Sequence, residues 1–211
     1  QDVLVTINGT AFQRLVKRTQ NSFANTGALS SPTQTTSTRY FPYTSSTAEF
    51  NYDYDTGNLI SSTTTNYGYT DGWGNPTSVN VSTTDAATGT VFTGTTTNTY
   101  FNNSATWVLG RLTNSVVTRG ATGKIAQTRT ASFTPDPNTG LTTQEINEPN
   151  NAAFKVISDY AYDIYGNRTS VTQRTDIAST DPNWFPSRTT TTSYAATTFN
   201  PIAGQFPSSS I

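Results

Sequence analysis

The sequence predicts an all-β protein, in which repeated hairpins form an extended antiparallel sheet, a spiral or meander whose edges are completed by neighbouring repeats or subunits. Threonine makes up about a fifth of the residues, and its branched Cβ favours strands. Short segments rich in Thr, Val, Ile, Tyr and Phe alternate with turn-forming Gly, Asn, Asp and Pro. Similar segments recur at a nearly fixed interval, as in stacked repeat proteins, and no convincing apolar stripe has a helical period.

The repeat interval is set by five aromatic residues, each of which follows a Thr-rich run. Their separations are 31, 33, 29 and 32 residues: Tyr69, Tyr100, Phe133, Tyr162 and Tyr194. Each is followed within ten residues by a glycine: Gly74, Gly110, Gly140, Gly166 and Gly204. We therefore expect each repeat to be one hairpin, and consecutive hairpins to pair edge to edge.

The N-terminal part is expected to differ from the rest of the chain. Residues 1–19 predict a hairpin, because alternating aliphatic residues flank Asn8-Gly9, a strong turn signal. Residues 20–38 are polar with few apolar residues, and we expect a long loop there. The predicted organisation is thus an N-terminal hairpin and polar lead-in at 1–37, involved in assembly, followed by a repeat array at 38–211.

The array is expected to contain short strands separated by turns. Its first strand, 49–54, alternates aromatic and polar residues and ends at the turn 55–58. Further strands are predicted at 59–70, 77–84, 90–100, 111–119, 124–134, 141–147, 154–163, 168–175 and 187–195. The clearest turns are 71–76, 86–89, 136–140 and 165–167. We expect one aromatic and aliphatic face and one Thr/Ser/Asn face, which bury little without a partner.

One motif carries a resemblance to a known family. The segment Tyr162-Asp163-x-x-Gly166-Asn167-Arg168 resembles the tyrosine-aspartate (YD) repeat of rearrangement-hotspot (Rhs) proteins, of bacterial toxin-complex shells and of teneurins. With weaker matches included, the resemblance to YD repeats covers about residues 38–211. The matching positions are Tyr54, Asp55, Gly57, Asn58, Tyr69, Gly74, Asn75, Tyr100, Gly110, Tyr162, Asp163, Gly166, Asn167 and Tyr194.

The resemblance implies a large β-sheet that spirals into a hollow shell, often around a toxic C-terminal polypeptide. The Asp of the repeat is replaced in three units, by Phe101, Thr134 and Ala195. The common element is therefore the pattern of strands and turns. A complete shell needs many more repeats, and the family's self-cleaving motif is not apparent.

Composition excludes much catalytic chemistry. The chain has no histidine and no cysteine, which rules out Ser-His-Asp and Cys-His nucleophiles, thiolate or imidazole zinc sites and disulfides. Only 12% of residues are charged and the net charge is −1, so we expect no nucleic-acid partner. No apolar run is long enough to span a membrane and no signal peptide is present. We predict a protein that is not an enzyme, with no cofactor and no catalytic or metal-binding residue.

Three groups of residues nevertheless call for a comparison between a functional and a structural interpretation. Asp53-x-Asp55-x-Gly57-Asn58 is similar to a calcium loop but lacks the distal glutamate, so we interpret it as a turn. The carboxylate pairs Glu145/Glu148 and Asp159/Asp163 fit sugar hydrolysis less well than they fit solvated strand and turn charges. The rings of Trp73, Trp107 and Trp184 are candidates for stacking on a glycan, although packing in a core is the favoured interpretation.

These observations favour a non-enzymatic, secreted structural protein, located outside the cell or on its surface, that builds a fibre, tube or shell. Its expected partners are identical subunits or neighbouring YD repeats, joined by strand pairing. One alternative is a fragment of an Rhs shell that encloses a toxin, and another is a carbohydrate-binding or adhesive module. Because the chain contains no methionine, we expect Gln1 to follow a cleavage or to begin an excised piece.

Overall fold

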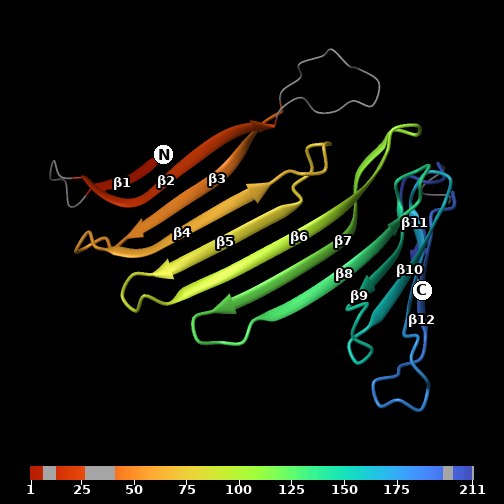
Figure 1. Ribbon diagram of the computed structural model, residues 1–211. Helices are drawn as coiled ribbons and strands as arrows, with labels where there is room; N and C mark the ends of the chain where they lie inside the picture. Colours follow the sequence, from red (N-terminus) through yellow and green to blue (C-terminus); the bar gives the residue numbers. More distant parts are fainter. Residues whose placement is uncertain (7–12, 27–40, 197–201, 211) are drawn as a thin grey trace. The chain divides into compact units, whose positions relative to one another are not determined.

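A computed structural model describes residues 1–6, 13–26, 41–196 and 202–210. They form one antiparallel sheet of thirteen strands, in which spatial order equals chain order (Figure 1). The strands are β1 (Asp2–Thr6), β2 (Gln13–Thr26), β3 (Phe41–Tyr52), β4 (Leu59–Gly68), β5 (Ser78–Asp85), β6 (Val91–Asn103), β7 (Val108–Ala121), β8 (Gln127–Pro135), β9 (Thr142–Asn147), β10 (Val156–Tyr162), β11 (Arg168–Arg174), β12 (Arg188–Ser193) and β13 (Ser209–Ser210). The predicted all-β meander of hairpins is confirmed, and the sheet is not closed.

The N-terminal region departs from prediction in one respect. The expected hairpin is present, since β1 pairs with β2, although its Asn8-Gly9 turn lies outside the described residues. The expected loop from residue 20 is wrong, because β2 continues to Thr26 and pairs with β3 as far as Thr26↔Phe41. Polar residues suit these strands because they bond across the ladder, as the Thr47 hydroxyl does to the Asn21 side-chain oxygen at 3.0 Å.

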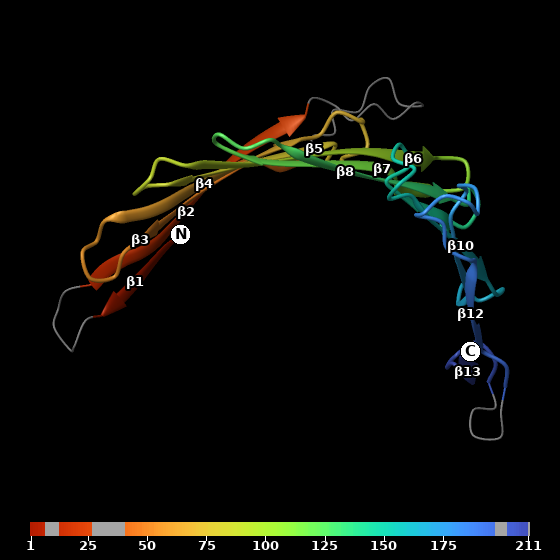
Figure 2. The same ribbon diagram turned by 90° about the horizontal axis from the view of Figure 1, so that it is seen from below.

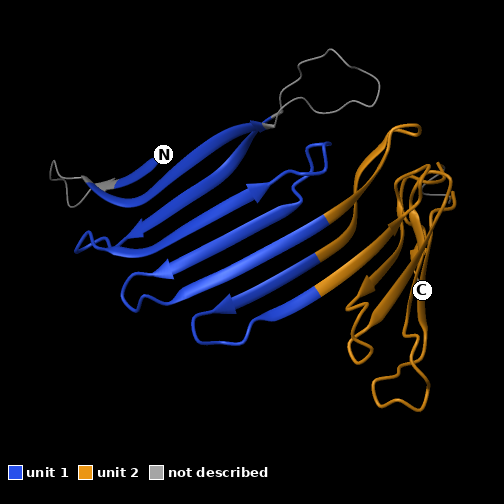
Figure 3. Ribbon diagram, viewed as in Figure 1, with its two compact units in different colours: residues 1–98, 116–129 blue, residues 99–115, 130–211 orange. Residues whose placement is uncertain are grey.

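The chain divides into two compact units (Figure 3). Unit 1 comprises residues 1–98 and 116–129, and therefore holds β1 to β5 with parts of β6, β7 and β8. Unit 2 comprises residues 99–115 and 130–211, with the remaining parts of those strands and β9 to β13. The predicted boundary at residues 37 and 38 lies inside unit 1, between the paired strands β2 and β3.

Neither unit has a substantial core. Among the described residues only Val108, Gly140, Ile157 and Ser158 are buried, and no side chain is fully enclosed. Figure 2 shows no second layer over either face of the strands in unit 1 or in unit 2. The accessible surface is 13697 Å², whereas a compact protein of this mass exposes about 9,600 Å². The strands are thus held by backbone pairing and contacts along the sheet.

The two faces of strands β4 to β6 differ largely as predicted. One face carries Tyr67 opposite Val79 and, on adjacent strands, Val81 and Phe92. The other face carries polar rows, such as Thr64, Ser82 and Thr93. The first face is not wholly apolar, since Thr63 lies opposite Thr83 with 2.9 Å between their hydroxyl oxygens.

The topology explains the repeat interval. Two strands and two connections make one repeat, and every aromatic leader lies at or near the end of an even-numbered strand. Tyr69 directly follows β4 and Tyr194 directly follows β12, whereas the other three lie in β6, β8 and β10. The glycines that follow them therefore all belong to the connections after even-numbered strands, or to the start of the next strand.

Candidate functional site

The connections carry the most regular chemistry of the chain. Three of them share the sequence Asp-x-x-Thr-Gly-x and the same set of hydrogen bonds: Asp53–Asn58, Asp85–Thr90 and Asp136–Leu141. In each, the Thr amide and hydroxyl donate to the Asp carboxylate. The glycine has a positive φ of 75°, 69° and 72° respectively, which glycine adopts without steric cost. The shared string was readable in the sequence but had not been singled out there.

The first of these turns shows how the aspartate works. One carboxylate oxygen of Asp53 accepts from the Thr56 amide at 2.6 Å and from its hydroxyl at 2.7 Å. The Gly57 amide donates to the Asp53 carbonyl at 2.9 Å, and the Asp53 amide donates to the Asn58 carbonyl at 2.7 Å. Asp55, the position aligned with the YD repeat, is exposed, and its carboxylate accepts no hydrogen bond within the described chain. Tyr54 is exposed as well.

These bonds shift the acidity of the turn aspartates. The Thr56 amide, with its hydroxyl, lowers the pKa of Asp53 below its usual value. The Thr88 amide does the same to the pKa of Asp85, and the Thr139 amide to that of Asp136. The ionised carboxylate is thus the form that this turn stabilises. In each turn one carboxylate oxygen accepts the protein donors. The described residues contain no group of three or more Asp or Glu side chains placed to hold a metal ion.

A second kind of turn uses Asp-x-x-Gly-Asn and occurs at 71–75 and 163–167. Asp163 accepts from the Tyr165 amide at 2.9 Å, and from the amide and side chain of Asn167 at 2.9 and 3.0 Å. The Trp73 and Asn75 amides donate in the same way to Asp71. The matching glycines, Gly74 and Gly166, have φ values of 82° and 84°.

The connection after β6 is a variant of the first kind. Its sequence, Asn103-Ser104-Ala105-Thr106-Trp107, places asparagine at the aspartate position and tryptophan at the glycine position. Trp107 has a φ of 57°, which is uncommon for a bulky residue, and 77% of it is exposed. Thr106 and Asn103 donate to the Pro137 carbonyl at 2.7 and 3.3 Å, so this turn is bonded to the next one along the sheet.

Successive turns after even-numbered strands stack on one another in unit 2. A Cβ built on Gly140 would lie 2.6 Å from the Arg111 side chain, and one on Gly166 would lie 3.8 Å from Leu141. A Cβ on Gly204 would lie 2.4 Å from the Tyr165 ring, and the Asn167 side chain donates to the Gly204 carbonyl at 2.8 Å. Gly140 and Gly204 therefore leave room for a side chain of the preceding repeat, whereas an added Cβ on Gly166 would make only an ordinary contact. The feature that all five glycines of the period share is a positive φ.

The aromatic leaders make local contacts. Tyr69 packs on Tyr43 with 4.4 Å between ring centroids, and the Tyr162 hydroxyl donates to the Thr142 carbonyl at 2.7 Å. Tyr194 accepts the Gly204 amide through its carbonyl at 2.8 Å. Tyr100 lies half-buried in β6, and at the start of β7 the Gly110 amide donates to the Asn102 side chain at 2.8 Å.

The three tryptophans are not brought together. Trp73, Trp107 and Trp184 lie on three different connections and are 38%, 77% and 40% exposed, so the expectation of core packing is wrong. Trp107 and Trp184 belong to unit 2, but they follow strands that run in opposite directions. These two indoles therefore lie at opposite ends of the strands of unit 2 and do not form one platform.

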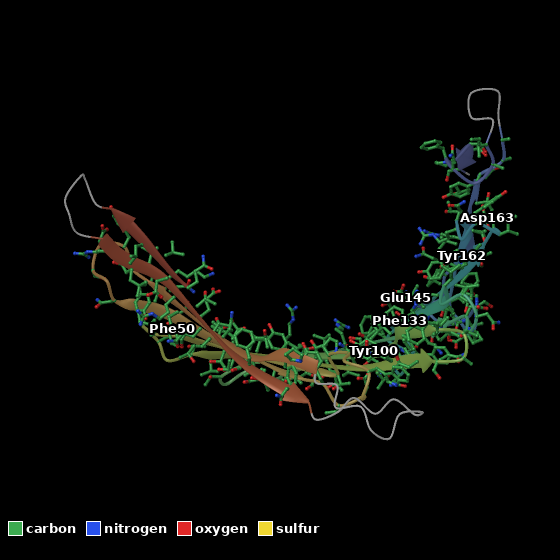
Figure 4. All side chains as sticks on the ribbon, turned by 90° about the horizontal axis from the view of Figure 1, so that it is seen from above. Phe50, Tyr100, Phe133, Glu145, Tyr162 and Asp163 are labelled. Carbon is green, nitrogen blue, oxygen red and sulfur yellow. The ribbon has the colours of Figure 1, made fainter. Side chains whose placement is uncertain are left out.

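Three of the four carboxylates that we interpreted as strand and turn charges make local hydrogen bonds or an ion pair. Glu145 accepts from the Tyr160 hydroxyl at 3.0 Å, and burial, followed by this carboxylate, raises the pKa of Tyr160. Asp159 accepts from Arg174 at 2.6 Å and from Gln144 at 2.7 Å. Asp163 accepts the hydrogen bonds of its own turn, and Glu148 lies in the connection after β9. Figure 4 shows that Glu145 and Asp163 lie apart along unit 2.

One hollow lies on the surface of unit 1, across β5, β6 and β7. Its volume is about 410 Å³, and it is lined chiefly by Val81, Phe92, Gly94, Val117 and Arg119. A Cβ built on Gly94 would meet only the Val81 Cβ, at 3.9 Å, so the glycine opens the sheet surface without being required by a neighbour. Half of Phe92 is exposed, and Arg119 is exposed. Sequence analysis did not identify this hollow, because its lining comes from three strands.

No model of a protein family matches the chain, and no curated protein matches it. The likeness to YD repeats therefore stays a prediction. Among the described residues, no helix is long and apolar enough to cross a membrane.

Proposed function

We propose that this chain is a non-enzymatic structural module, a building block of a larger extracellular assembly in which further copies cover its exposed faces. The observation that supports this most is the excess surface. The chain exposes about 4,100 Å² more than a compact protein of its mass. Specific protein interfaces bury about 1,200–2,000 Å² in total, so association with other copies would account for a surface of this size.

The outer strand β1 is the place for strand pairing between subunits. Gln1 and Thr19 exchange two hydrogen bonds, of 2.6 and 2.8 Å, so the backbone groups of the next residue, Asp2, point away from β2. The strand has only five residues and the opposite outer strand β13 only two. Short outer strands limit pairing between sheets, so we assign most of the contact to the faces.

A shell of YD repeats is the second candidate, supported by the stacked glycine turns of unit 2. Each of these turns contacts the preceding one through a glycine, as Gly166 contacts Leu141. Further repeats of the same polypeptide would continue this row and complete the outer strands. In that case the chain would be a segment of a longer wall, and the isolated chain would not assemble into regular particles.

The test is the mass of the purified chain by light scattering over a wide concentration range, with negative-stain microscopy of the same samples. We expect regular oligomers, filaments or tubes. A solitary monomer at the highest concentration would contradict the proposed assembly, and irregular aggregates would favour the shell segment.

Pairing at β1 is tested separately with Asp2→Pro, using Asp2→Ala as the matched control. Both variants lose the ion pair of Asp2 with Arg18, but only proline removes the outward-pointing amide. We expect Asp2→Pro to associate more weakly than Asp2→Ala if the strand takes part. Equal association of the two variants would assign the contact to the faces alone.

A further inference from the structure

Trp107 occupies a position that the other turns of its kind give to glycine. The three Asp-x-x-Thr-Gly turns have glycine there, with φ values between 69° and 75°, whereas Trp107 has a φ of 57°. A left-handed conformation costs a residue with a side chain about 1–2 kcal/mol. Strained residues of this kind persist where function requires them, and 77% of this indole is exposed to solvent.

Packing does not account for the tryptophan. Nothing in the described structure gives its indole a hydrogen bond or ring contact, whereas its neighbour Val108 is among the few buried residues. The turn is held instead by Asn103 and Thr106, which bond to the Pro137 carbonyl. Replacing the indole would therefore leave the turn's own contacts intact, and its exposed ring is free to bind elsewhere.

The hollow of unit 1 has the shape and chemistry to take an aromatic ring. Its floor is Gly94, its walls include Val81, Phe92 and Val117, and Arg119 stands at its side. An indole stacks on an aromatic ring and attracts a guanidinium over its face. Arg119 has no ion-pair partner within the described chain, so its guanidinium is available for such a contact.

We propose that Trp107 of one copy inserts into the Gly94 hollow of a second copy. This inference rests on the proposed function and adds the residues of one contact. A single indole buries about 150–250 Å², too little for a stable interface alone, so it acts as an anchor within a wider contact of the faces. The net charge of −1 presents little electrostatic repulsion between copies.

The contact has a consequence for symmetry. The exposed Trp107 indole, the knob, and the Gly94 hollow are different surfaces. After one contact has formed, one copy retains a free hollow and the other a free knob. Such a head-to-tail contact produces a ring if the rotation closes and a filament if it does not. A two-fold dimer, in which each copy inserts its indole into the other, is the smallest closed form of this contact.

Two variants test the proposal. Trp107→Ala removes the knob, and Gly94→Leu adds a side chain to the hollow, where only Val81 lies within 4 Å of the added Cβ. The matched controls are Trp184→Ala, an exposed indole on another connection, and Thr95→Leu, which places the same side chain on the opposite face of β6. Circular dichroism and thermal melting verify that each variant retains the sheet.

We expect self-association, measured by sedimentation, to weaken at least tenfold in Trp107→Ala and in Gly94→Leu and to remain unchanged in both controls. Mixing the two weakened variants should restore association, because one supplies the knob and the other the hollow. The mixed species should stop at one copy of each, since neither variant can extend it.

The outcomes separate this inference from the proposed function. A wild-type chain that stays monomeric overturns both. Wild-type assembly that is unchanged in Trp107→Ala and Gly94→Leu overturns the inference alone, as does a mixture that shows no restored association. If the hollow instead binds a glycan, all variants would associate alike, and Phe92→Ala would abolish retention on an oligosaccharide column; that result also overturns the inference.

Discussion

The ring of Tyr165 lies directly over Gly204, where a Cβ built on the glycine would be 2.4 Å from the ring. The contact joins the turn after β10 to the connection after β12 within unit 2. It is reinforced by the hydrogen bond from the Asn167 side chain to the Gly204 carbonyl. Glycine at position 204 is thus a requirement of contact between repeats as well as of turn geometry.

Gly204→Ala should be the most damaging of the glycine substitutions. It adds a steric overlap with Tyr165 to the cost of a φ of 84°, so we expect a loss of about 2–4 kcal/mol, measured by urea unfolding of unit 2. Gly57→Ala is the control, because its φ is 75° and nothing lies within 4 Å of the added Cβ; it should lose only about 1–2 kcal/mol. In a Tyr165→Ala background, the two substitutions should cost the same. Unequal costs there would show that the ring is not the obstacle.

Acid should weaken the turns through their aspartates. The pKa values of Asp53, Asp85 and Asp136 are lowered in the folded chain, so their contribution is present above the unfolded pKa of about 3.9 and is lost as pH falls through the folded value. We expect the melting temperature to be steady near neutral pH and to fall below about pH 4.

Replacement of the three aspartates by asparagine should lower the melting temperature at neutral pH. It should also reduce the fall in melting temperature below about pH 4, since asparagine keeps the acceptor oxygen without the titrating charge. Asp55→Asn in the first turn is the control, because the Asp55 carboxylate accepts no turn bond. If the melting temperature of the triple variant fell with pH as steeply as that of the wild type, the three aspartates would not be the cause of the acid sensitivity.

Trp107→Gly should stabilise the fold. Glycine relieves the left-handed conformation at a φ of 57°, and we expect a gain of about 1–2 kcal/mol by thermal or urea unfolding. Gly89→Ala makes the opposite change in a related turn with nothing within 4 Å, and should lose a similar amount. If Trp107→Gly lowered stability instead, the indole would have a packing role within its own chain.

One of the two hydrogen bonds between neighbouring turns needs asparagine rather than aspartate at position 103, and the other comes from Thr106. Asn103→Asp replaces a donor to the Pro137 carbonyl by a charged acceptor, and we expect a loss of about 1–3 kcal/mol together with faster amide exchange in both turns. Asn138→Asp, an exposed change of equal charge in the adjoining turn, is the control. Equal effects of the two substitutions would mean that the added charge, not the lost donor, is responsible.

Most strands were predictable because their turns are marked by unambiguous residues. Between residues 59 and 195 each predicted strand corresponds to an observed one, with ends that differ by a few residues. Residues 20–26 and 41–48 were missed because Ser, Thr, Asn and Gln are frequent there and the few apolar residues, such as Phe23 and Tyr43, do not alternate regularly with polar ones. Without that alternation a strand is hard to recognise in a sequence.

The site chemistry was less accessible from the sequence. The resemblance to YD repeats drew attention to Asp55, whereas the turn bonds belong to Asp53, two residues earlier. Counting three Asp-x-x-Thr-Gly strings would have found these turns. The conformation of Trp107 follows only from placing its segment against those strings, and the Gly94 hollow requires the register of three strands.

The equality of chain order and spatial order also determines how the protein would respond to a mechanical load. Tension transmitted along the polypeptide would detach an outer strand by opening its hydrogen bonds in succession, and would then reach the next strand. No distant segment of the described sheet locks two ladders together, so extension would proceed as a series of small, similar yielding steps. An assembly of such chains would lengthen before it broke.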